Sequence, residues 1–184
     1  RLGIDICITS SQKCLGLPAG LAACTFSRKA VERARMVKNR GFYLDLLQLY
    51  DFIQKKDYQY PSTPSLAHMF ALDYQLNYII NEEGLENRFA RHEEMMEMVR
   101  EWAGRNFALL AEDDIASRTV TTVVNTKNID ISELNRELKK RGMMISNGYG
   151  ELKDKTFRIA HMADTTPAQI TELLDNLDDI LGLN

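Results

Sequence analysis

The stretch ITSSQKCLGLPAGLAACTFS, residues 8–27, joins two predicted strands through a turn that contains a lysine. The apolar run at residues 2–9 is short and rich in isoleucine, which is typical of a buried strand. Residues 20–27 indicate a second strand after a turn that contains glycine and proline. Lys13 lies in the turn shortly after the first strand. Because lysines mostly lie in solvent, a lysine at the end of a buried strand needs an explanation.

Two interpretations of Lys13 are open from the local pattern. It is either a solvated loop residue or a side chain that projects into the crevice where α/β sheets bind ligands at the carboxyl ends of their strands. A partly desolvated ammonium group loses its proton more easily, and the neutral amine can form a Schiff base with a carbonyl cofactor. Ser10, Ser11 and Gln12 would then supply neutral hydrogen-bond donors for a phosphate group nearby.

Composition narrows the class of protein. The chain has 184 residues, of which 45% are hydrophobic and 27% are charged, which is a globular composition. The net charge of −3 and the absence of a basic stripe argue against a nucleic-acid partner. No apolar run approaches the ~20 residues of a membrane span, so no membrane association is expected. Three cysteines without a CxxC or Cys/His cluster indicate reduced thiols in a cytoplasmic protein and predict no metal site.

The remaining patterns predict a helical middle and a compact α+β end. Ser27 is the expected N-cap of the first helix, and Thr166 followed by Pro167 is the expected start of the last one. A proline-marked loop is expected at residues 56–65. Helices are expected at 27–37, 43–56, 65–84 and 85–107, followed by a β-α-β-β-α unit with elements at 119–126, 131–142, 143–148, 156–162 and 166–183. Because position 1 is an arginine followed at once by an apolar run, we expect the chain to be the C-terminal part of a longer polypeptide.

Five segments resemble those of one enzyme family. SSQKCLGLPAGLA is similar to the GSQKxLxxPPG segment of the class V aminotransferases, and TFRIAHMAD is similar to their xFRIGHMG segment. The segments GFYLDL, YPSTPSLAHMFALDYQL and EEGLENRFARH also resemble the family and occur in the family's order. These are fold-type I pyridoxal-phosphate enzymes, and the alanine–glyoxylate and serine–pyruvate aminotransferase branch is the most similar one. The resemblance extends over essentially the whole chain.

The resemblance implies an α/β fold in two parts. Residues 1–85 would complete the large pyridoxal-phosphate domain, with the end of its mostly parallel sheet. Residues 86–184 would form a linking helix and a small C-terminal α+β domain of order β-α-β-β-α.

The resemblance also implies a cofactor site around the lysine. Lys13 matches the residue that holds pyridoxal 5'-phosphate as a Schiff base and moves a proton at the substrate Cα. Gln12 and Ser11 match positions beside the cofactor phosphate, whereas Ser10 stands where the family often has glycine. Tyr60 and Thr63 match a tyrosine and a threonine that reach the phosphate from the neighbouring subunit of a homodimer with shared active sites.

Arg158 is the expected substrate-binding residue. An arginine inside an apolar strand needs an anion or exposure to solvent, and its planar fork suits a carboxylate held by two parallel hydrogen bonds. The matching arginine of the family binds the α-carboxylate of the amino acid. A structural ion pair is the alternative interpretation of Arg158.

The implied reaction is transamination between a small amino acid, such as alanine or serine, and a 2-oxo acid, such as glyoxylate or pyruvate. The family's partner for the pyridine nitrogen, its ring-stacking aromatic residue and its Gly-rich phosphate loop come from the N-terminal half of the enzyme, so these 184 residues alone are expected to be inactive. Two alternatives stay open: another class V transaminase, acting on aspartate, ureidoglycine or an aminophosphonate, or a non-catalytic dimerisation module if the native chain starts at Arg1.

Overall fold

The computed structural model describes residues 2–57 and 59–183, and the chain divides into two compact units. The first unit is Arg1–Leu76 and the second is Asn77–Asn184. The expected boundary after residue 85 concerns the domains of a complete enzyme, and it stays a prediction. Each unit is described by itself below.

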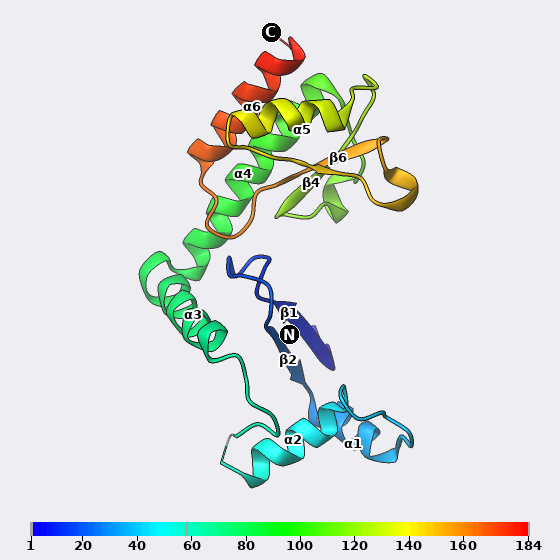
Figure 1. The fold of residues 1–184 in the computed structure, drawn as a ribbon, viewed down its shortest axis with the longest axis vertical. Coiled ribbons are helices and arrows are strands. Elements are labelled where there is room, and N and C mark those ends of the chain that lie inside the picture. The colour runs from blue at the N-terminus through cyan, green and yellow to red at the C-terminus, as the bar shows by residue number, and fades with distance from the viewer. Residues whose placement is uncertain (1, 58, 184) are drawn as a thin grey trace. The chain divides into compact units, whose positions relative to one another are not determined.

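The first unit consists of a β-hairpin followed by helices (Figure 1). Strands β1 (Ile6–Ser10) and β2 (Ala22–Phe26) pair antiparallel, with Ile6 opposite Phe26 and Ser10 opposite Ala22. Two helices come next in the chain, α1 (Arg28–Met36) and α2 (Leu46–Lys55), and α3 (Leu66–Asn77) follows the proline-marked loop.

Side chains at the helix starts explain where α1 and α2 begin. The hydroxyl of Ser27 accepts a hydrogen bond from the backbone N–H of Ala30, as its expected N-cap position requires. The carboxylate of Asp45 accepts from the backbone N–H of Leu47 and starts α2 in the same way. Each cap satisfies a backbone donor that has no partner inside its own helix.

The burial predicted for the first strand is wrong for this chain. Ile6 is 49% exposed and Ile8 is 67% exposed. Within this unit β1 and β2 form a two-stranded antiparallel pair, whereas the mostly parallel sheet was expected of the complete large domain. A hairpin without flanking strands and helices cannot cover both of its faces, so β-branched side chains that suit a buried strand stay in contact with solvent.

The second unit is a four-stranded antiparallel sheet with helices packed against it. It begins with a π-helical segment, η1 (Tyr78–Glu83), which Gly84 separates from the long helix α4 (Leu85–Asn106). The sheet order is β3-β4-β6-β5, formed by β3 (Ala108–Leu109), β4 (Val120–Val124), β5 (Ser146–Asn147) and β6 (Thr156–Ala160). Helices α5 (Ile131–Lys140) and α6 (Pro167–Leu181) complete the unit, and two short 3₁₀ turns are η2 (Asp113–Ile115) and η3 (Gly150–Leu152).

The core of the second unit surrounds Trp102 of α4. Its ring packs at a centroid distance of 6.5 Å from the ring of Phe157 in β6, and its Nε1 donates to Asp178 of α6 at 2.6 Å. Phe107 contacts both rings, with centroids 5.5 and 5.3 Å away. Met95 of α4 is fully buried in the same core.

The β-α-β-β-α order predicted for residues 119–183 is confirmed. Three details of the predicted elements in the chain differ. The pattern did not predict β3, because a two-residue edge strand carries too little periodicity to be recognised. The predicted strand at 143–148 is reduced to the two residues of β5. The single helix expected at 65–84 changes into the π-helical η1 after Asn77, a change that the apolar pattern does not encode.

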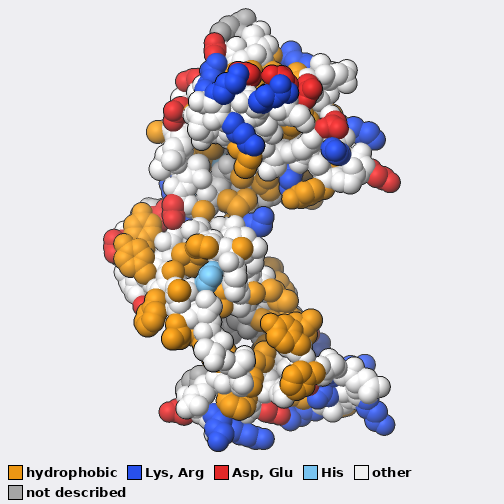
Figure 2. Space-filling model, viewed as in Figure 1, with side chains coloured by type: hydrophobic (Ala, Val, Ile, Leu, Met, Phe, Trp, Pro, Cys, Tyr) orange, Lys and Arg blue, Asp and Glu red, His pale blue; other side chains and the backbone are white. Residues whose placement is uncertain are grey.

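Hydrophobic side chains are exposed at several places on the surface (Figure 2). Phe42, Tyr43, Phe70 and Tyr74 of the first unit are each more than 70% exposed. Among residues 2–57 and 59–183, no helix is both long enough and apolar enough to cross a lipid bilayer.

Candidate active site

Lys13 lies in the turn that directly follows β1 and is exposed. The turn closes on itself because the N–H of Gly16 donates to the carbonyl of Lys13 at 2.9 Å. Within the part of the chain that the structure describes, no hydrogen bond or ion pair engages the amine of Lys13. The backbone of this residue is therefore held while its amine is available to a ligand.

Ser11 anchors the same turn. It is 2% exposed, and its hydroxyl donates to the carbonyl of Pro18 at 2.6 Å. Its backbone N–H donates to the carbonyl of Leu21 at 2.9 Å, and its carbonyl accepts from Leu17 at 3.0 Å. Because a hydroxyl has one proton to donate, a side-chain bond from Ser11 to a phosphate would require the bond to Pro18 to break. The neighbouring Gln12 is exposed, and its side chain makes no hydrogen bond within residues 2–57 and 59–183.

Tyr60 and Thr63 lie in the loop before α3, and both are exposed. Residues Gln59–Pro64 and Leu66 line a shallow surface hollow there. The structure thus places the two hydroxyls on one loop that is open to solvent. Their predicted contact with the cofactor of a neighbouring subunit stays a prediction.

His68 is a residue of this region that the sequence patterns did not single out. Its Nδ1 lies 2.8 Å from the hydroxyl of Ser65, and its Nε2 lies 3.1 Å from the carbonyl of Ala19. A carbonyl only accepts, so Nε2 carries the proton. His68 therefore links the Tyr60–Thr63 loop to the segment after Lys13.

Gly20 makes the link from His68 possible. Its φ is +140°, and a Cβ built on it would lie 2.8 Å from the Nε2 of His68. A side chain at this position would displace the imidazole. Gly20 thus permits both the backbone turn after Pro18 and the close approach of the His68 side chain.

Arg158 is the middle residue of β6, an interior strand of the second unit's sheet. Its neighbours Phe157 and Ile159 are almost completely buried in the core, so alternation turns the half-buried Arg158 to the opposite face. Its Nε donates to the carbonyl of Asn147 at 3.1 Å, and its guanidinium carbon lies 4.0 Å from the ring centroid of Tyr149. Among the described residues no carboxylate pairs with Arg158, which disfavours the structural ion pair.

The EEGLENRFARH segment forms a partly buried ion network. Arg88, which is 4% exposed, donates to Glu83 at 2.6 Å and to Asp164 at 3.0 Å. Arg91 donates to Glu83 at 2.8 Å, to the carbonyl of Ala163 at 3.0 Å, and to the carbonyl of Thr165. Burial alone would raise the pKa of Glu83, but the hydrogen bonds from the two arginines outweigh it and the pKa is lowered. The network ties the start of α4 to the loop that follows β6.

His92 of α4 and His161, which directly follows β6, are both buried. His161 is fully buried, and its Nε2 lies 2.9 Å from the hydroxyl of Thr121. His92 is 6% exposed, and its Nδ1 donates to the carbonyl of Arg88 at 2.6 Å. Burial lowers the pKa of His161 from its usual 6.5 to about 4, and nearby His92 adds to the shift. Both side chains are thus part of the buried interior of the second unit.

Comparison with known proteins decides the family. The family model described as Aminotransferase class-V matches residues 1–166. This chain belongs to the class V aminotransferases. It is 40% identical over 167 residues to an uncharacterized aminotransferase of Methanocaldococcus jannaschii, covering 88% of this chain and 42% of that protein. It is 32% identical over 184 residues to serine–glyoxylate aminotransferase of Arabidopsis thaliana, covering 97% of this chain and 45% of that protein.

Solved structures confirm the predicted fold class for this class V aminotransferase chain. Alanine–glyoxylate aminotransferase from Nostoc sp. superposes with a TM-score of 0.86 at 26% identity, covering 97% of this chain and 48% of that one. Pyridoxamine–pyruvate aminotransferase from Mesorhizobium loti gives a TM-score of 0.87 at 29% identity, covering 97% of this chain and 47% of that one. The chain spans less than half the length of these relatives.

Pyridoxal phosphate is the cofactor of the class V aminotransferases, as the sequence predicted. The residues around Lys13 fit it in part. The amine of Lys13 is available for a covalent bond to an aldehyde, and the exposed side chain of Gln12 offers a neutral donor to a phosphate. The hydroxyl proton of Ser11 is committed to Pro18, so that residue fits less well. The described residues contain no group of three or more His, Cys, Asp or Glu side chains suited to a metal ion.

Proposed function

We propose that the complete protein is a pyridoxal-phosphate-dependent aminotransferase that moves an amino group between a small amino acid and a 2-oxo acid. Alanine or serine is the expected donor, and glyoxylate or pyruvate is the expected acceptor. The observation that carries this proposal is the placement of Lys13 in a chain of this family: its backbone is fixed by the turn after β1, and its amine is exposed.

Each candidate residue has a distinct task in this proposal. Lys13 holds the cofactor and moves the proton at the substrate Cα, a general acid–base task that a neutral amine can perform. Gln12 binds at the phosphate. Arg158 binds the substrate carboxylate and thereby orients the Cα–H bond. The bound cofactor supplies a conjugated ring that withdraws electrons from the bonds at this carbon.

We further propose a homodimer in which Thr63, and with it Tyr60, reaches the phosphate in the other subunit's site. Hydrogen bonds from neutral hydroxyls to a charged phosphate contribute ~1.5–3 kcal/mol each. The exposure of both residues on one open loop supports this role. A twofold axis would complete both sites at one self-complementary interface. Cys7, Cys14 and Cys24 form no disulfide within the described part of the chain. This supports the expected cytoplasmic location, which cell fractionation would test.

The role of Lys13 can be tested by covalent trapping in the full-length protein. Borohydride fixes the cofactor to the lysine that holds it, and peptide mapping then identifies the modified residue. We expect the modified peptide to contain Lys13, and we expect the Lys13→Ala variant to yield none. Modification of a different lysine in the wild-type protein would refute the assignment.

A further inference from the structure

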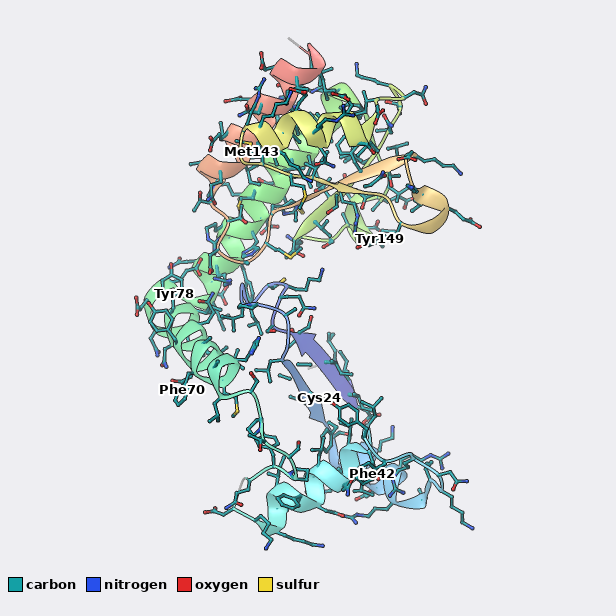
Figure 3. All side chains as sticks on the ribbon, in the orientation of Figure 1. Cys24, Phe42, Phe70, Tyr78, Met143 and Tyr149 are labelled. Carbon is teal, nitrogen blue, oxygen red and sulfur yellow. The ribbon has the colours of Figure 1, made fainter. Side chains whose placement is uncertain are left out.

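The side chain that covers Arg158 is Tyr149, on the loop between β5 and β6 (Figure 3). The ring centroid of Tyr149 lies 4.0 Å from the guanidinium carbon of Arg158, within the range of a cation–π contact. Tyr149 is nevertheless 77% exposed, so the ring contributes little to the core of the second unit. The position of this exposed ring is better explained by its effect on the orientation of the Arg158 guanidinium.

Two contacts define the orientation of the Arg158 guanidinium. The ring of Tyr149 lies over the guanidinium, and the carbonyl of Asn147 accepts a hydrogen bond from Nε at 3.1 Å. No further bond to this guanidinium occurs among residues 2–57 and 59–183. The edge that carries both Nη groups therefore keeps its donors, and two parallel N–H groups on that edge match the two oxygens of a carboxylate.

The loop that carries Tyr149 is fixed by its own short-range contacts. The side-chain oxygen of Asn147 accepts from the N–H of Gly148 at 2.7 Å and from the N–H of Asp154 at 2.9 Å. The amide nitrogen of Asn147 donates to the carboxylate of Asp154 at 2.6 Å. Gly148 leaves no room for a side chain, because a Cβ built there would lie 2.1 Å from the carbonyl oxygen of Leu152. The aromatic ring is thus held by a rigid loop.

We propose that Tyr149 is a positioning residue for substrate recognition. It holds the guanidinium of Arg158 so that the Nη edge meets the carboxylate end-on, while the Nε edge stays bound to Asn147. This inference rests on the proposed role of Arg158 in carboxylate binding. It adds that the geometry of binding is set before the ligand arrives, by an aromatic ring that does not itself bind the carboxylate.

The expected size of the effect follows from the cost of ordering a side chain. Immobilising a long side chain on binding costs enough to weaken affinity several-fold, and a pre-ordered side chain avoids that cost. Removing the ring of Tyr149 should therefore weaken carboxylate binding by about 3- to 10-fold. Phenylalanine keeps the ring face, so Tyr149→Phe should bind the carboxylate within about 2-fold of the wild type.

Equilibrium binding to the full-length, cofactor-loaded enzyme tests this inference without relying on turnover. The probe is propionate, with its dissociation constant measured by ligand-observed NMR. Propionamide is the control ligand, because it has the same shape and no charge. The proteins are the wild type, Tyr149→Ala, Tyr149→Phe, Arg158→Ala and the double variant Tyr149→Ala/Arg158→Ala.

The inference predicts a distinct pattern across these variants. Tyr149→Ala should weaken propionate binding by about 3- to 10-fold without changing that of propionamide, and Tyr149→Phe should restore it. Adding Tyr149→Ala to Arg158→Ala should weaken propionate binding no further, since the ring acts through the guanidinium. An unchanged affinity in Tyr149→Ala, an equal loss for both ligands, or an additive double variant would overturn the positioning role.

A different set of results would refute the proposed role of Arg158 in carboxylate binding. If the wild-type enzyme does not bind propionate, or if Arg158→Ala binds it as the wild type does, Arg158 is not the carboxylate site. In that case the positioning role falls with it. If Arg158→Ala loses propionate binding selectively while Tyr149→Ala does not, only the inference about Tyr149 is refuted.

Discussion

Replacing Gly148 with alanine is expected to destabilise the second unit by about 3–5 kcal/mol. A Cβ at this position would lie 2.1 Å from the carbonyl oxygen of Leu152 and 2.5 Å from the hydroxyl of Thr156. An ordinary contact needs more than 3 Å, so the backbone would have to move by roughly 1 Å. Overpacking of this kind costs about 1–3 kcal/mol.

Hydrogen bonds around Gly148 add to the expected loss. Its N–H donates to the carbonyl of Thr156 at 2.9 Å, and the carbonyl of Leu152 accepts from Lys155 at 3.1 Å. A shift of the loop would weaken both bonds, and each is worth about 1 kcal/mol. The same shift would carry Tyr149 away from Arg158, so the substitution also tests how rigidly the loop holds the ring.

The chain offers a matched control in Gly104 of α4. A Cβ built on Gly104 meets nothing within 4 Å, and the residue lies in an exposed part of the helix. Alanine is the better helix former, so Gly104→Ala should stabilise the unit by ~0.5–1 kcal/mol. Glycine-to-alanine substitution is thus expected to destabilise the second unit at position 148 and to stabilise it at position 104.

Urea unfolding of the 184-residue chain measures both effects. Trp102 is the only tryptophan of the chain and is 1% exposed in the core of the second unit, so its fluorescence reports on that unit. With a slope near ~2 kcal/mol per molar urea, Gly148→Ala should lower the unfolding midpoint by about 1.5–2.5 M. A midpoint equal to that of the wild type, measured beside a stabilised Gly104→Ala, would show that the loop accepts a side chain and would refute the steric argument.

Two further predictions concern pH and the dimer. The pKa of His161 is lowered to about 4 in the folded chain, so its full contribution to the free energy of unfolding is present above pH 6.5, where the imidazole is neutral. This contribution is lost as the pH falls toward 4, because the unfolded state binds the proton more readily. About 2 kcal/mol should be lost between pH 7 and pH 5. Urea unfolding at these two pH values should show this loss in the wild type and a smaller one in His161→Gln; equal losses would disprove the assignment to His161. For the dimer, inactive Lys13→Ala subunits mixed with inactive Tyr60→Phe/Thr63→Val subunits should regain activity, because a loop acting in trans leaves one site of each mixed dimer intact. No recovery after confirmed subunit exchange would show that the loop acts within its own subunit.

Local sequence determined the ends of several elements and the candidate residues themselves. Ser27 and Thr166 cap α1 and α6 as predicted, since capping is a contact between a side chain and the backbone only a few residues away. The family segments likewise pointed to Lys13, which is exposed, and to Arg158, which is half-buried, and their roles stay predictions. Such features need no knowledge of the rest of the chain.

Tertiary structure alone decided which residues meet. Arg88 pairs with Asp164 across 76 positions, and His68 reaches Ala19 across 49, and no periodicity links residues so far apart. The contact between Tyr149 and Arg158 depends on how the loop between β5 and β6 folds back on β6. The identities of the two residues alone do not predict it. The exposure of β1 has the same origin: β-branching predicts a strand, but burial depends on which other elements cover its faces.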